Sequence, residues 1–117
     1  MARLPWPEPD DFIVEKRRDS VFQDTEFDLW LKASRADTVI FSGIDTNICA
    51  QSSMRDAFNN GWDVIPVNDC VASRNLDRHQ STLAQVGETY AWVMSSREPL
   101  GRVESEELEL STTEEAA

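Results

Sequence analysis

Residues 38–60 read TVIFSGIDTNICAQSSMRDAFNN, and this stretch decides the expected fold. It opens with the short apolar, β-rich run Thr38–Phe41, which a Ser-Gly break follows at residues 42–43. From Ile48 onward, apolar residues recur at helical spacing. The pattern predicts a buried strand, a tight turn and a helix, with Cys49 in the first turn of that helix. In open α/β sheets, ligands bind at this place, beyond the carboxyl ends of the strands.

The rest of the chain continues the alternation of strands and helices. We expect a short β-type run at residues 12–14, strands at 38–41, 62–67 and 90–94, and helices at about 25–34, 45–60 and 76–89. Such alternation implies a parallel sheet with right-handed crossovers. The predicted fold class is therefore α/β, a Rossmann-like parallel sheet with helices on both faces. With about four strands instead of the usual five or six, the fold should be truncated and lack its first strand and helix.

The two ends of the chain differ in composition from its centre. Residues 1–11 contain three prolines and predict an irregular lead-in. The α/β domain is expected at residues 12–100. Residues 101–117 are rich in glutamate and have no apolar periodicity, so we expect an acidic, disordered tail there.

The charge balance and the apolar pattern exclude several functions. Eleven basic residues stand against 22 acidic ones, a net charge of −11, whereas DNA- and RNA-binding proteins present a basic face. No apolar run approaches the roughly 20 residues that span a bilayer, and the N-terminus has no apolar secretory segment. We therefore expect a cytoplasmic protein without nucleic-acid or membrane partners. Acid excess with scarce lysine also suggests adaptation to salt.

Two cysteines and one histidine limit the metal and redox chemistry. Cys49 and Cys70 lack the spacing of a zinc site, and a disulfide is not expected in a cytosolic chain. His79 lies in a polar stretch and is expected to be a solvated helix residue. We predict no metal and no cofactor. A redox protein that uses both thiols is a weaker alternative, and it requires the two sulfurs to approach closely.

The position of Cys49 suits a nucleophile. A thiol in the first turn of a helix meets the positive end of the helix dipole and unpaired N–H groups, and both favour the thiolate. A nearby ammonium could shuttle a proton, and the N–H groups of the turn could form an oxyanion hole. The residues alone leave open an inert thiol that packs the helix onto the sheet. On composition, Lys16 would be a solvated lysine in a charged turn.

Three motifs in the same order resemble one family. Residues 43–73, GIDTNICAQSSMRDAFNNGWDVIPVNDCVAS, resemble the signature of the isochorismatase-like cysteine hydrolases, the superfamily of nicotinamidases and N-carbamoylsarcosine amidohydrolases. Residues 14–31, VEKRRDSVFQDTEFDLWL, resemble the motif upstream of that signature. Residues 94–98 resemble the closing strand and the turn after it. The resemblance covers about residues 10–100.

The resemblance implies a role for each candidate site residue. Cys49 would be the nucleophile that attacks an amide or related carbon of a small molecule. Lys16 would be the lysine of the catalytic triad, in place of the solvated residue that composition suggests. A cis peptide bond between Ile44 and Asp45, just before the signature residue Thr46, would aim the N–H groups of Asp45 and Cys49 at the developing oxyanion.

The resemblance also implies an aspartate as general base at the end of a first strand, and nothing before Lys16 matches that context. We therefore expect a truncated hydrolase of a C–N bond with little or no activity. The alternative is a non-catalytic half-fold that serves as an oligomerisation module, because an uncovered strand edge invites pairing. We also expect the chain to form a homo-oligomer.

Overall fold

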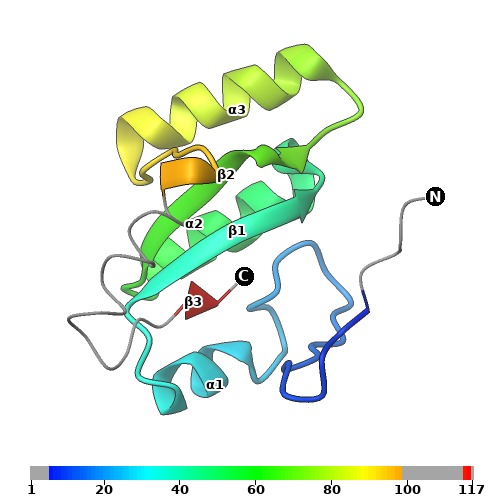
Figure 1. Ribbon diagram of the computed structural model, residues 1–117, viewed down its shortest axis with the longest axis vertical. Coiled ribbons are helices and arrows are strands. Elements are labelled where there is room, and N and C mark those ends of the chain that lie inside the picture. The colour runs from blue at the N-terminus through cyan, green and yellow to red at the C-terminus, as the bar shows by residue number, and fades with distance from the viewer. Residues whose placement is uncertain (1–5, 99–114, 117) are drawn as a thin grey trace.

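The computed structural model describes residues 6–98 and 115–116. Figure 1 shows its elements, which in chain order are α1 (Phe27–Ala33), β1 (Thr38–Ile44), η1 (Thr46–Ala50), α2 (Gln51–Asn59), β2 (Asp63–Ala72), α3 (Leu76–Thr89) and β3 (Glu115–Ala116). η1 is a single π-helical turn that continues directly into α2. None of the described helices is both long and apolar enough to cross a membrane.

The sheet is parallel and has the strand order β2-β1-β3. η1 and α2 form the crossover between β1 and β2, as the strand–turn–helix pattern predicts. The α/β class with a parallel sheet is therefore confirmed. β3 pairs with residues 38–39 of β1 and falls in the predicted acidic tail. The other residues of that tail, 101–114 and 117, lie outside the described residues, as do residues 1–5 of the lead-in.

One face of the sheet carries the core. Val39 and Val64 are partners in the β1–β2 register, and both are fully buried. Residues paired in register point to the same face, so these two mark the face that the helices cover. Leu31 of α1, Met54 of α2 and Val86 of α3 belong to the same buried cluster. One layer of helices thus packs on one side of the sheet.

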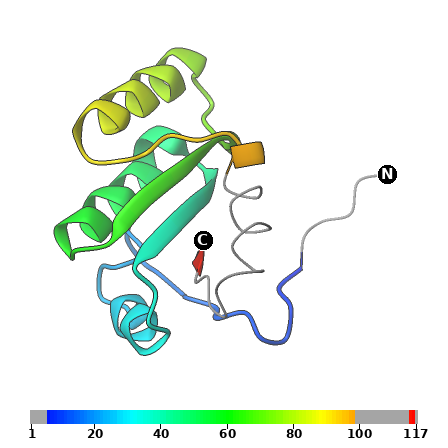
Figure 2. The same ribbon diagram turned by 60° about the vertical axis from the view of Figure 1, so that its left-hand side comes forward.

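The opposite face of the sheet is less covered. The next pair along the register, Ile40 and Ile65, points to that face and is only half-buried. Figure 2 shows α2 and α3 on the same side of β1 and β2. Neither Ile40 nor Ile65 belongs to the buried cluster that holds Val39 and Val64.

Two of the predicted β segments are not regular strands. Residues 12–14 form no strand, and Phe12 packs on Trp30 with 4.9 Å between ring centroids. Residues 90–94 run beside β2 but make only isolated bridges, through Ala91 and Met94, and Trp92 is 56% exposed. The strand predicted at residues 12–14 was wrong, and Ile13 there is 68% exposed. Residues 90–94 do exchange backbone hydrogen bonds with β2, such as that from the Trp92 N–H to the Val64 carbonyl at 3.0 Å, but without a continuous ladder.

Candidate active site

The carboxyl end of β1 turns directly into η1. The register with β2 shifts between Phe41 and Gly43, and Gly43 adopts a φ of 108°, which glycine tolerates without steric cost. A cis peptide bond joins Ile44 to Asp45, the bond at which the family resemblance implies one. Cys49 follows within η1 and is half-buried. Its thiol therefore lies just beyond the carboxyl end of a parallel strand, where ligands bind in such sheets.

Thr46 links the start of η1 to α3. The residue is fully buried, and its hydroxyl oxygen lies 2.8 Å from Nδ1 of His79. The prediction of a solvated His79 was wrong, because the ring is half-buried and hydrogen-bonded. The side chain of Asn75 accepts a hydrogen bond from the backbone of Arg78 and caps α3, which fixes where His79 projects.

Asp45 is buried, with 9% of its surface exposed. It occupies the N-cap position of η1, but its side chain makes no cap hydrogen bond. Its carboxylate instead pairs with Arg74 at 3.4 Å. Both residues line a cavity of about 240 Å³ together with Ile48 and Arg78. This cavity adjoins the cis peptide and carries two guanidinium groups.

Lys16 closes a turn instead of contacting the thiol. Its Nζ donates hydrogen bonds to the backbone carbonyls of Arg18 and Asp19, each at 3.1 Å, and its side chain is exposed. Among the hydrogen bonds of the described residues, none joins Lys16 to Cys49. The structure therefore places the ammonium on the turn that faces Cys49.

Asp19 is the site residue that sequence reasoning missed. The Cys49 thiol lies 3.5 Å from Oδ1 of Asp19 and donates to it. The turn is docked on α2 by a second bond, in which the backbone N–H of Val21 donates to Oγ of the buried Ser53 at 2.9 Å. The available signal was an acidic residue inside the same motif that contains Lys16.

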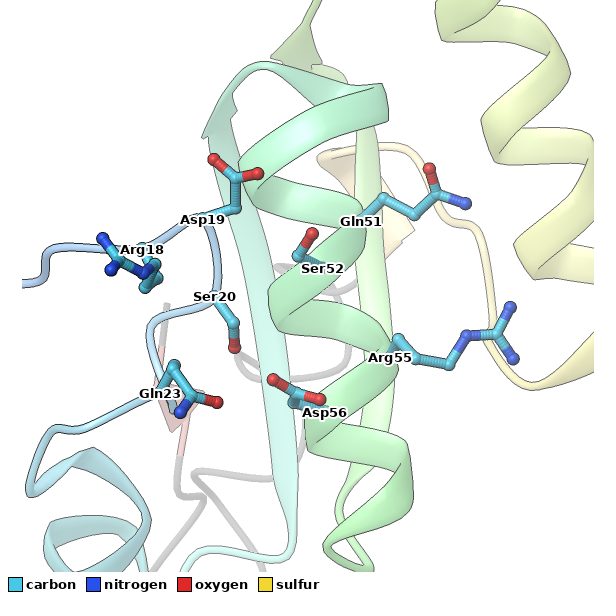
Figure 3. Close-up of a pocket in the computed structure, with 8 residues that line it drawn as sticks. All are labelled: Arg18, Asp19, Ser20, Gln23, Gln51, Ser52, Arg55 and Asp56. Carbon is cyan, nitrogen blue, oxygen red and sulfur yellow. The ribbon is translucent and has the colours of Figure 1, made fainter.

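An open depression of about 620 Å³ lies between this turn and α2 (Figure 3). Asp19 stands at the end nearest η1, and Gln23 and Asp56 face one another further along α2. Arg55 extends from the other side of the helix. Asp19 itself is exposed, so its carboxylate is reached from solvent.

The second cysteine, Cys70, has different contacts from Cys49. Cys70 is an exposed free thiol beside Asp69, whereas Cys49, also free, contacts Asp19. The two cysteines thus make no contact that supports a redox pair. Asp69 accepts hydrogen bonds from the hydroxyl and backbone N–H of Ser96, and these bonds lower the pKa of Asp69. No group of three metal-ligating side chains occurs in the part of the chain that the structure describes.

Comparison with known proteins extends these observations. Residues 3–98 match the family model of the isochorismatase domain. The ureidoacrylate amidohydrolase RutB of Methylobacterium radiotolerans is 34% identical over 88 residues, which cover 74% of this chain and 34% of that protein. The maleamate amidohydrolase of Pseudomonas putida is 29% identical over 94 residues, which cover 80% of this chain and 44% of that protein. The chain thus spans less than half the length of both relatives.

Solved structures give the same result. An isochorismatase-like hydrolase from Alkaliphilus metalliredigens aligns with a TM-score of 0.81 and 34% identity, covering 85% of this chain and 55% of that one. The pyrazinamidase/nicotinamidase of Streptococcus mutans aligns with a TM-score of 0.66 and 34% identity, covering 68% of this chain and 44% of that one. With the motifs, the parallel α/β fold and the family model in agreement, the chain belongs to the isochorismatase family.

Proposed function

We propose that this chain is a cysteine hydrolase that cleaves an amide or related C–N bond of a small molecule. The observation that carries the proposal is the position of the Cys49 thiol, in the turn after β1 and against the Lys16–Asp19 turn. The reaction class is supported by relatives that are named amidohydrolases.

In the proposed mechanism, the Cys49 sulfur attacks the amide carbon as the thiol proton leaves. The N–H groups of Asp45 and Cys49 would donate to the oxyanion that develops on the carbonyl oxygen. Lys16, whose ammonium lies on the turn facing the thiol, would contribute positive charge near the forming thiolate. Loss of the amine leaves a thioester on Cys49, and water then hydrolyses it to release the acid and restore the thiol.

We expect this chain by itself to turn over slowly. It spans 34% of RutB from Methylobacterium radiotolerans and 44% of the maleamate amidohydrolase, so much of what surrounds the site in those proteins has no counterpart in this alignment. A cytoplasmic location is part of the proposal, because free thiols persist in a reducing compartment.

Self-association is a second part of the proposal. Within the described residues, the β1 edge that faces β3 is paired only at residues 38–39, which leaves residues 40–44 of that edge unpaired. Ile44 is 73% exposed and Trp92 is 56% exposed. Open strand edges and exposed apolar side chains are typical of interaction surfaces. A non-catalytic oligomerisation module would share this feature, so light scattering behind size exclusion is measured alongside turnover.

The catalytic proposal is tested with Cys49→Ala and a matched control, Cys70→Ala, which removes the other free thiol. Nicotinamide, maleamate and ureidoacrylate serve as substrates, and amine or ammonia release is measured. Turnover should vanish in Cys49→Ala and persist in Cys70→Ala, and an acyl adduct on Cys49 should be detected by intact mass. Equal turnover in Cys49→Ala and the parent would reject the nucleophile. Oligomers without Cys49-dependent turnover would favour the non-catalytic module.

A further inference from the structure

We propose that Asp19 is the general base that accepts the Cys49 thiol proton. The inference rests on the proposed cysteine-hydrolase function and adds the proton acceptor that this function needs. Its first support is direct geometry, because the thiol donates to Oδ1 of Asp19 across 3.5 Å. A candidate base must lie within hydrogen-bond reach of the proton that it removes, and contacts to sulfur are longer than those between nitrogen and oxygen.

The position of Asp19 is fixed by bonds on both sides of it. Lys16 Nζ donates to the Asp19 carbonyl at 3.1 Å, which closes the turn before the carboxylate. After it, the Val21 N–H donates to Ser53 Oγ at 2.9 Å, which docks the turn on α2. Cys49 and Ser53 are four residues apart and lie on one face of the η1–α2 helix. That face therefore holds both the thiol and the anchor of its carboxylate partner.

Asp19 can accept and return the Cys49 thiol proton in both halves of the reaction. As the C–S bond forms, the thiol proton passes to the Asp19 carboxylate, which returns it to the amine nitrogen as the C–N bond breaks. In the second half, Asp19 takes a proton from the water that attacks the thioester and gives it to the leaving sulfur. One water is consumed, and an acid and an amine are produced. No metal or redox partner is required.

In the contact between the two residues, the Cys49 thiol is the donor and the Asp19 carboxylate is the acceptor. A carboxylate beside a thiol disfavours the thiolate, because two negative charges would then lie close together. Removing the Asp19 charge should thus have opposite effects on two reactions. Alkylation, which needs only thiolate, should become faster, whereas amide hydrolysis, which needs the base, should become slower.

The experiment compares the parent chain with Asp19→Asn, Asp19→Glu and Asp63→Asn, all carrying Cys70→Ala so that one thiol reacts. Asp63 is the matched control, because it is an exposed carboxylate at the start of β2, the end of the sheet opposite to Cys49. Alkylation by iodoacetamide at pH 7 is followed by intact mass, and hydrolysis of maleamate by ammonia release. Circular dichroism verifies that each variant is folded.

For Asp19→Asn we expect alkylation to accelerate about threefold or more and hydrolysis to fall on the order of 10²-fold. Asp19→Glu should recover part of the hydrolysis, and Asp63→Asn should change neither rate. Hydrolysis in Asp19→Asn equal to the parent overturns the base role and leaves the proposed function intact. Unchanged alkylation in Asp19→Asn overturns the contact itself. A parent chain without Cys49-dependent hydrolysis overturns both proposals, and the alkylation series then reports whether the carboxylate lies beside the thiol.

Discussion

Replacing His79 by alanine should destabilise the chain through Thr46. The Thr46 side chain is fully buried, and its hydroxyl lies 2.8 Å from Nδ1 of His79. A buried polar group that loses its partner costs about 1–3 kcal/mol. Because His79 is half-buried, water reaches part of the vacated space, so we expect about 1–2 kcal/mol. For a domain of this size, about 1 kcal/mol corresponds to roughly 4–8 °C in Tm.

The assay is a double-mutant cycle measured by urea unfolding. Thr46→Val removes the hydroxyl without changing the side-chain shape, and combined with His79→Ala it should cost less than the sum of the single changes, by about 0.5–1.5 kcal/mol. Gln80→Ala, an exposed neighbour on α3, should stay within about 0.5 kcal/mol of the parent. An unchanged unfolding midpoint for His79→Ala, or strictly additive energies, would refute the claim that this bond holds η1 against α3.

Three further predictions concern stability. Tyr90→Phe should be neutral or stabilise by up to about 1 kcal/mol in urea unfolding. Among the described residues, the Tyr90 hydroxyl is the one buried side-chain nitrogen or oxygen without a hydrogen-bond partner. Burial raises the pKa of Asp28, but hydrogen bonds from Lys32 and Trp62 outweigh it and the pKa falls below 3.8. Its stabilisation is therefore present above pH 3.8 and lost as pH falls through the lower folded pKa, so Asp28→Asn should flatten the decline of Tm between about pH 4 and pH 2. With a net charge of −11, Tm should rise from low to molar NaCl, and a flat response would reject salt adaptation.

The centre of the fold could be predicted from local patterns. The continuous apolar run at residues 38–41 and the helical spacing after Ile48 are properties of the segments themselves, and both became the elements predicted. Residues 12–14 and 90–94 are apolar too, but their structure depends on distant partners. Phe12 is packed by Trp30, and Ala91 forms an isolated bridge with Val64. Short apolar runs do not encode such partners.

In the candidate site, too, some features follow from local patterns and others depend on distant partners. The place of Cys49 followed from strand, turn and helix, whereas the roles of Lys16 and of the bond before Asp45 came only from the family resemblance. The contacts of His79 and Asp19 could not be predicted, because each reaches across 30 or more positions of the chain. Both contacts depend on how a neighbouring segment docks on η1 and α2, and a single sequence does not specify that docking.

The docking of the Lys16–Val21 turn changes how the chemistry of Cys49 is to be tested. An ammonium and a carboxylate enter the site on one turn, which is anchored by the bond from Val21 to Ser53 and by packing of Val21 on the core. Loss of that anchor would move both charges away from the thiol at once, so effects of Lys16 and Asp19 on reactivity should not be additive. Substituting Cys49 alone identifies the nucleophile, but only the joint behaviour of the turn and the thiol distinguishes a working proton acceptor from a buried cysteine that happens to follow a strand.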